Sequence, residues 1–312
     1  MPERSYRRFA QIVFFLAALV APVTQNTSFF ADLGGESKLS TFVASDGDNI
    51  AIQDWPLQHG SVLRGVVVLV HGLGEHAGRY DAVAKKLNDW GFAVRGYDQH
   101  GHGESGGVRG GLPTDRRLLV DLADIVATTR TRMDKGCPLI LLGHSMGGLV
   151  AARFVSLKSR AVQGLVLSSP ALDAGLGRWQ KLMVTVLAKV LPGFRVGNGL
   201  DVAALSHDRG VILAYQTDPL VHDRISARLA RFISQGGAAV LAAAPAWKVP
   251  TLLLYAGDDR LVNPAGSRAF ADAVPSKLIT AQCFDAMFHE IFNEPDANQV
   301  FSALQAWLDA RF

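Results

Sequence analysis

Short apolar runs alternate with helical patterns along most of the chain. Runs typical of buried strands occupy residues 65–70, 92–98, 139–142, 162–169, 250–257 and 276–284. Patterns typical of helices occupy residues 80–90, 115–133 and 294–312. Continuous apolar character, as in GVVVLV at 65–70, is expected of strands that are covered on both faces. Strands that alternate with helices predict an α/β fold with a doubly wound, mostly parallel sheet.

Two further strands are expected at the start of the sheet. LSTFVAS at 39–45 and IAIQDW at 50–55 flank the residues DGDN, which are typical of a turn. This pattern predicts a hairpin.

Residues 171–247 interrupt the alternation. This segment contains no strand-like run, whereas 178–191 and 223–244 carry helical patterns. The sequence therefore predicts a helical cap inserted between two strands of the sheet. The expected division of the chain is a leader at 1–37, a first core part at 38–170, the cap at 171–247, and a second core part at 248–312.

The N-terminal segment has a pattern of its own. Arg4, Arg7 and Arg8 precede an uncharged run from Phe9 to Val23. A basic start followed by a short apolar run is typical of a secretory signal, and the run is shorter than the ~20 residues that comfortably span a bilayer. No clean cleavage site follows, so an uncleaved anchor or a start codon assigned too early are the alternatives. We expect an exported or membrane-associated protein, with a cytoplasmic location as the alternative.

Composition and charge exclude little. The 312 residues are 49% hydrophobic and 19% charged, which is ordinary for a globular protein. The formal net charge of +3 is spread along the chain, so nucleic-acid binding gains no support. Cys137 and Cys283 lie far apart and no CxxC spacing occurs, so each is expected to be a buried, unpaired thiol.

A candidate nucleophile lies in LILLGHSMGGLVAARF. Ser145 sits among glycines where an apolar strand becomes a helical pattern, and GHSMG fits the GxSxG elbow that presents a serine hydroxyl on a tight turn. The alternative for Ser145 is a helix N-cap. A serine hydroxyl is a weak nucleophile and needs an adjacent base, which is usually a histidine held by a carboxylate.

Candidates for both partners follow in the chain order of doubly wound hydrolases, which is serine, acid, histidine. Asp258 and Asp259 both follow the strand in LLLYAGDDRLVNP. Their spacing from the strand favours Asp259, whereas Asp258 is expected to be a solvated turn residue or a helix cap. His289 follows the last predicted strand and precedes the closing helix. We therefore expect it to be the base.

Ester attack places negative charge on the carbonyl oxygen, which backbone N–H groups can stabilise. One donor is expected at Met146, directly after the nucleophile. The other is expected at Leu73, in the loop HGLGEH that follows a predicted strand. Gly72 and Gly74 let that backbone approach a ligand closely.

Several histidines raise the question of a metal site. HGHGES resembles the start of some dinuclear hydrolase motifs, but the Asp-His pair that should follow is absent. Imidazoles that support glycine-rich loops through hydrogen bonds are the simpler interpretation. We expect no metal and no cofactor, and this interpretation covers His71, His76, His100, His102 and His144.

Several blocks together resemble the monoacylglycerol lipase and lysophospholipase branch of the α/β-hydrolases. They extend from about Leu39 to the C terminus and are HGLGEHAGRY, YDQHGHGESGG, GHSMGG, LSHDRGVILAYQTDPLVH, LLLYAGDDRLV and FHEIFNE. HGLGEHAGRY and TDPL are more specific than GxSxG, which other α/β-hydrolases share. The resemblance implies the α/β-hydrolase fold, with the nucleophile at Ser145, the acid at Asp259, the base at His289, and oxyanion amides at Leu73 and Met146.

The resemblance also implies an apolar helical lid that approaches membranes. Some of its side chains are expected to pack on the core, and others to line an acyl channel or contact lipid. The residues that match this description are Trp179, Leu182, Met183, Val186, Leu187, Val190 and Leu191.

The expected function is hydrolysis of monoacylglycerol-type lipid esters through an acyl-enzyme, which releases fatty acid and glycerol. A lysophospholipid is the alternative substrate, and Arg79 or Arg109 would be candidates for holding its phosphate. A serine aminopeptidase is less favoured because it needs acidic groups in the cap to hold an amine. The few acids there are chiefly Asp173, Asp201, Asp208, Asp218 and Asp223.

Two other classes of protein with this fold are not favoured. Dehalogenases and epoxide hydrolases use an aspartate nucleophile, which Ser145 excludes. A non-enzymatic ligand-binding relative would usually lack one member of the triad, whereas candidates for all three occur here.

Overall fold

The computed structural model describes residues 37–44 and 46–312. The leader expected at 1–37, with its apolar run, lies outside the described residues except for Ser37. In the described part of the chain, no helix combines the length and the apolar character that crossing a bilayer requires.

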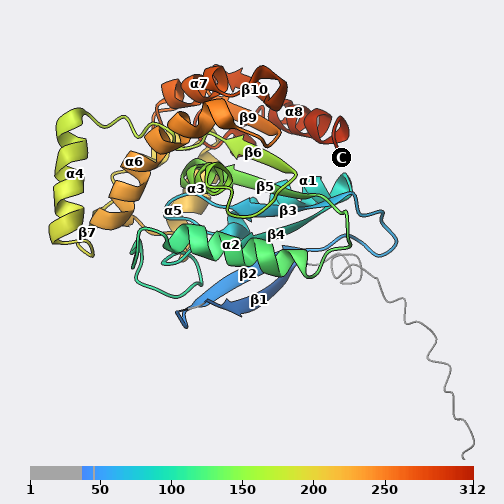
Figure 1. Cartoon of the computed structure of the whole chain (residues 1–312), viewed down its shortest axis with the longest axis horizontal. Coiled ribbons are helices and arrows are strands. Elements are labelled where there is room, and N and C mark those ends of the chain that lie inside the picture. The colour runs from blue at the N-terminus through green and yellow to red at the C-terminus, as the bar shows by residue number, and fades with distance from the viewer. Residues whose placement is uncertain (1–36, 45) are drawn as a thin grey trace, which may run out of the picture.

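The expected doubly wound, mostly parallel sheet is confirmed (Figure 1). Within residues 37–44 and 46–312, the main sheet has the strand order β1-β2-β4-β3-β5-β6-β9-β10. β1 pairs with β2 and β2 with β4 in antiparallel fashion, and all other pairs are parallel. The strands are β1 Lys38–Val43, β2 Asn49–Trp55, β3 Gly65–Val70, β4 Phe92–Tyr97, β5 Leu139–His144, β6 Gly164–Ser168, β9 Thr251–Ala256 and β10 Ile279–Phe284.

Alternate residues of the central strands face two separate cores. Val68 and Leu141 belong to the core on one face, whereas their neighbours Val67 and Leu142 belong to the core on the other. This follows from the two-residue period of a strand. The first core also takes side chains from α2 Arg117–Arg130, α3 Ser145–Ser156 and α7 Pro264–Ala273, and the second from α1 Asp81–Asp89 and α8 Asn298–Asp309.

The segment between β6 and β9 carries α4 Arg178–Val190, α5 Arg209–Thr217 and α6 Ala227–Ala243. Figure 1 shows α4 at the outer edge of the molecule, beside α6 and away from the sheet. The expectation that this segment lacks strands is wrong. β7 Arg195–Gly197 and β8 Arg224–Ser226 pair antiparallel there. Each has three residues, too few for an alternating pattern to appear in the sequence.

Short 3-10 helices also occur between the strands and the α-helices. They are η1 Ala77–Tyr80, η2 Val202–Ala204, η3 Ala244–Ala246, η4 Ser276–Leu278 and η5 Ile291–Asn293. Cys137 and Cys283 are unpaired as expected, but they are half-buried rather than buried.

Candidate active site

Ser145 occupies the sharp turn between β5 and α3. Its φ angle is +51°, a left-handed conformation that costs a non-glycine residue free energy and concentrates at functional sites. A Cβ at Gly143 would collide with the backbone of Gly147, and a Cβ at Gly147 would collide with the carbonyl oxygen of Val70. The glycines of GHSMGG therefore allow the turn to close tightly against β3.

His289 and Asp259 form a buried pair at the carboxyl end of the sheet. Nδ1 of His289 lies 2.7 Å from Oδ2 of Asp259, and the two side chains are 4% and 3% exposed. The other carboxylate oxygen of Asp259 accepts hydrogen bonds from the N–H groups of Leu261 and Val262, at 2.9 Å each. Asp258 instead pairs with Arg260 on the surface at 2.9 Å. Of the two candidate aspartates, Asp259 is thus the one in contact with His289.

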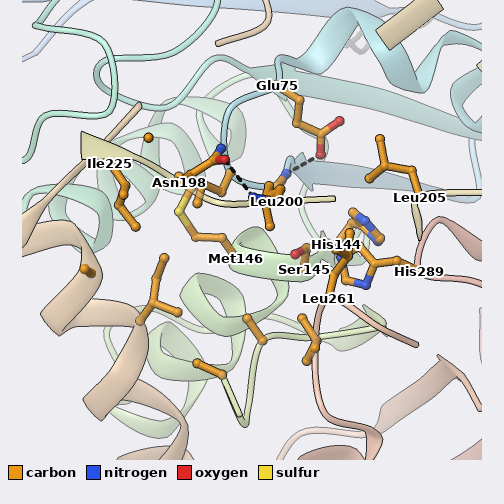
Figure 2. Close-up of a pocket in the computed structure, with 18 of the residues that line it drawn as sticks. Glu75, His144, Ser145, Met146, Asn198, Leu200, Leu205, Ile225, Leu261 and His289 are labelled. Atoms are coloured by element: carbon orange, nitrogen blue, oxygen red, sulfur yellow. Dashed lines mark hydrogen bonds between the residues drawn. The ribbon is translucent and has the colours of Figure 1, made fainter. Parts of the chain in front are cut away.

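Ser145 and His289 line the same cavity, which has a volume of about 330 Å³. Figure 2 shows them together with His144 at one end of this cavity, and Asn198 and Ile225 at the other. Apolar side chains from α4, α6 and the β7–β8 region also line the cavity, including Val184, Val196, Ile225, Ala230 and Ile233. The structure therefore brings Ser145 and His289 to one apolar chamber, and Asp259 is bonded to His289 without lining the chamber itself.

Leu73 and Met146 line this cavity as well. Met146 lies in the first turn of α3, where a backbone N–H has no acceptor within the helix. Among the described residues, no protein group accepts a hydrogen bond from the N–H of Leu73. Both amides thus remain able to donate to a ligand.

A buried charge network beside the site was missed by the sequence analysis. Arg79 donates to Glu75 at 2.6 Å and to both carboxylate oxygens of Glu290 at 2.7 and 2.9 Å. The hydroxyl of Tyr80 donates to Glu75 at 2.6 Å. Glu75 and Glu290 also line the cavity. Two signals were present in the sequence, because Glu75 belongs to HGLGEH and Glu290 directly follows His289.

Burial and these partners shift several pKa values. Burial alone would raise the pKa of Glu75, but Arg79 together with nearby imidazoles and Tyr80 lowers it to about 2. Burial, followed by the proximity of His289, lowers the pKa of His144 to about 4. At neutral pH Glu75 is therefore an anion and His144 a neutral ring.

The model of a known protein family, described as serine aminopeptidase S33 (Hydrolase_4), matches residues 61–296 of the chain. The chain belongs to this family of α/β-hydrolases. It is 37% identical to a monoacylglycerol lipase of Mycolicibacterium smegmatis over 254 residues, which are 78% of this chain and 88% of the relative. It is 31% identical to phospholipase YtpA of Bacillus subtilis over 248 residues, which are 78% of this chain and 95% of the relative.

A longer relative is an uncharacterized abhydrolase domain-containing protein of Dictyostelium discoideum. It is 30% identical over 279 residues, which are 88% of this chain, and the chain spans 29% of that protein's length.

Solved structures share the fold of this α/β-hydrolase. Monoacylglycerol lipase of Paleococcus ferrophilus has a TM-score of 0.75 and 32% identity, with 89% of this chain and 100% of that chain covered. A soluble variant of monoglyceride lipase from Saccharomyces cerevisiae, in complex with a substrate analog, has a TM-score of 0.80 and 26% identity, with 89% and 96% covered. The expected α/β-hydrolase fold is confirmed, and the chain is a carboxylic ester hydrolase.

The histidines of the glycine-rich loops bind other protein groups in this hydrolase. His71 contacts Gly72 and Gln99, His102 contacts the carbonyl oxygen of His100, and His144 contacts Ser168. His76 pairs with Asp218 at 2.8 Å, and His100 lies 3.2 Å from Asp48. In the part of the chain that the structure describes, no group of three or more His, Cys, Asp or Glu side chains is arranged to hold a metal ion.

The two arginines considered for phosphate binding are engaged elsewhere. Arg79 holds Glu75 and Glu290, and its side chain is 11% exposed. Arg109 donates to the carbonyl oxygen of Gly103 and does not line the cavity.

The five aspartates considered for amine binding do not line the cavity that contains Ser145 and His289. Asp201 and Asp208 cap helices, Asp173 bonds to Gly175 and Asn263, Asp218 pairs with His76, and Asp223 pairs with Arg224.

Proposed function

We propose that this hydrolase cleaves monoacylglycerol-type lipid esters through an acyl-enzyme on Ser145. The observation that carries the proposal is the apolar cavity that Ser145 and His289 share. A serine on a strained turn and a histidine bonded to a buried carboxylate lie at one end of a mostly apolar cavity. An acyl chain needs such an apolar wall, and the reacting carbonyl needs the catalytic end.

In this mechanism, Asp259 accepts the Nδ1–H of His289, which leaves Nε2 free to take the proton of Ser145. The serine oxygen then bonds to the ester carbon, and the carbonyl oxygen becomes an oxyanion that the amides of Leu73 and Met146 stabilise. The ester C–O bond breaks, and His289 returns the proton to the departing alcohol. Water repeats the same steps, releases the fatty acid and restores the serine hydroxyl.

The surroundings of the arginines favour monoacylglycerol over a lysophospholipid. A phosphate would need a cation that faces the cavity. Arg79 does not line the cavity, and its guanidinium is already bound to the carboxylates of Glu75 and Glu290. A neutral glycerol head group needs no such cation.

The same network argues against an aminopeptidase. An incoming ammonium group would need a carboxylate oxygen with no other hydrogen-bond partner, but Arg79 already donates to both Glu75 and Glu290. The remaining oxygen of Glu75 accepts from Tyr80 and Gly72, and Glu290 also accepts from Asn293.

We also propose that residues 171–247 act as a cap whose helix α4 contacts a lipid surface. Trp179, Met183 and Val190 are 79%, 70% and 69% exposed, and their spacing places them on one helix face. α4 also carries Arg178, Lys181 and Lys189 and no acidic residue. An apolar face flanked by cations suits the surface of an anionic bilayer.

A substrate panel tests the proposal. Purified wild-type protein and Ser145→Ala would be given 1-monoacylglycerols, lysophosphatidylcholine with the same acyl chain, and aminoacyl nitroanilides. We expect the highest kcat/KM for monoacylglycerol, with activity absent from Ser145→Ala. A preference for lysophosphatidylcholine or for nitroanilides would overturn the proposed substrate, and full activity of Ser145→Ala would overturn the mechanism.

A further inference from the structure

Gly72 is held from both sides by neighbouring side chains. Its N–H donates to Oε1 of Glu75 at 2.5 Å, and its carbonyl oxygen lies 2.8 Å from Nδ1 of His71. His71 is fully buried and Glu75 is 3% exposed. Gly72 immediately precedes Leu73, whose amide is the proposed oxyanion donor, so these contacts fix the start of the oxyanion loop.

The tautomer of His71 follows from its second contact. Nε2 of His71 accepts a hydrogen bond from the backbone N–H of Gln99 at 2.9 Å. A backbone N–H can only donate, so Nε2 carries no proton and the ring proton lies on Nδ1. Burial lowers the pKa of His71, which keeps the ring in this neutral form. His71 therefore donates to the carbonyl oxygen of Gly72.

The geometry of the peptide bond between Gly72 and Leu73 fixes the direction in which the N–H of Leu73 points. No cis peptide occurs among the described residues, and in a trans peptide the C=O and the following N–H point in opposite directions. Because the carbonyl oxygen of Gly72 faces His71, the N–H of Leu73 faces away from that ring. Leu73 lines the cavity, and a Cβ placed on Gly72 would lie 3.3 Å from the Cβ of Ser145.

The charge of Glu75 would oppose an oxyanion nearby unless it were compensated. Arg79 offsets part of this charge at 2.6 Å, although it also pairs with Glu290, and Tyr80 donates to the same carboxylate. The carboxylate can thus serve as a strong acceptor for Gly72 while Arg79 weakens its repulsion of the oxyanion.

We propose that His71 and Glu75 are positioning residues that hold Gly72 from opposite sides and thereby aim the N–H of Leu73 at the substrate carbonyl oxygen. This inference rests on the proposed function, because it assigns a role to an amide that acts only if an acyl group is attacked by Ser145. Glu75 and His71 act through the backbone and are not required to touch the substrate.

Two opposed variants of Glu75 test the proposal. Glu75→Gln keeps an oxygen within reach of the N–H of Gly72 but loses the charge. Glu75→Asp keeps the charge for Arg79 but withdraws the oxygen by one methylene. We expect Glu75→Asp to lower kcat by about 100- to 1,000-fold with little change in KM, and Glu75→Gln to retain most of the activity. If Glu75→Gln instead lost more kcat than Glu75→Asp, the charge of Glu75, and not the position of the Gly72 peptide, would determine the rate.

A second pair of variants, at His71, tests the contact with the carbonyl oxygen of Gly72. His71→Asn places an amide donor where Nδ1 stands, whereas His71→Leu removes the donor. His71→Leu should lose kcat, and His71→Asn should recover a large part of it. Tyr80→Phe removes one hydrogen bond to Glu75 but leaves the bond from Gly72, so it should lose less kcat than Glu75→Asp. Thermal unfolding of every variant would establish that the fold persists.

The inhibition constant of an alkyl boronic acid is a second measurement. It reports on the oxyanion site itself, which a purely structural role of Glu75 or His71 would not affect selectively. The tetrahedral adduct of the boronic acid with Ser145 places an oxygen where the oxyanion forms, so its Ki should rise in proportion to the loss of kcat. Folded Glu75→Asp and His71→Leu proteins with wild-type kcat and Ki would overturn the proposal. A wild-type protein that hydrolyses no ester would instead contradict the proposed function, so the two failures are distinguishable.

Discussion

Nδ1 of His289 lies 2.7 Å from Oδ2 of Asp259, and both side chains are almost completely buried. The two residues are 30 positions apart in the chain and come from the loops after β9 and β10, which are parallel neighbours. Parallel pairing brings the carboxyl ends of the two strands to the same edge, so the loops that follow meet there. The pairing of these strands therefore creates the contact.

Exchange of Asp259 for Asn should lower kcat by about 10⁴-fold, because an amide can donate to Nδ1 and favour the wrong tautomer of His289. Asp258→Asn is the matched control, since that exposed side chain pairs with Arg260, and its activity should stay near wild type. Steady-state rates on p-nitrophenyl butyrate would measure both. Equal losses in the two variants would contradict the assignment of Asp259.

Replacement of Ser145 by Ala should reduce ester hydrolysis by about 10⁴- to 10⁶-fold because the nucleophilic oxygen is removed. The left-handed backbone at this position remains, so the fold should persist. Ser156→Ala, at the other end of the same helix, controls for loss of a hydroxyl that bonds to the backbone of Arg153. Initial rates, with circular dichroism for folding, would check the prediction, and an active Ser145→Ala protein would refute it.

The double exchange Trp179→Ser and Met183→Ser should reduce cosedimentation with phosphatidylglycerol vesicles by about tenfold or more, because it removes exposed apolar surface from α4. Hydrolysis of a short, soluble ester should change little. Leu157→Ser is the control, because Leu157 is 51% exposed and lies at the end of α3, outside the cap. Unchanged vesicle binding would contradict lipid contact through α4.

Acidification from about pH 6.5 to about pH 4 should destabilise the protein through His144. Burial, with His289 nearby, lowers the pKa of His144 to about 4, whereas an unfolded histidine titrates near ~6.5. Between these values the unfolded state binds the extra proton, so the free energy of unfolding rises with pH. His144→Asn should reduce this slope by at most about 1.4 kcal/mol per pH unit. Urea unfolding at several pH values would measure it, and an unchanged slope would contradict the prediction.

Local patterns were enough to predict the strand–turn–helix around Ser145, because the apolar run, the glycines and the helical spacing are neighbours in the chain. Periodicity also predicted the alternation of strands and helices. The β7–β8 pair escaped prediction because three-residue strands carry no detectable period. Glu75 and Glu290 received no role because Arg79, which joins them, lies 211 residues from Glu290.

The sequence by itself determined which residue types can perform ester chemistry, their order along the chain, and the layered fold that carries them, since these depend on local spacing and on which side chains avoid water. The spacing after the strand also favoured Asp259 over Asp258, and the structure places Asp259 in contact with His289. Only the tertiary structure decided that Arg79 is committed to two carboxylates and that Gly72 is held between His71 and Glu75. Those relationships depend on how distant loops pack against one another. A hydrogen bond acts over about 3 Å, and no pattern along the chain encodes separations on that scale between residues far apart in sequence.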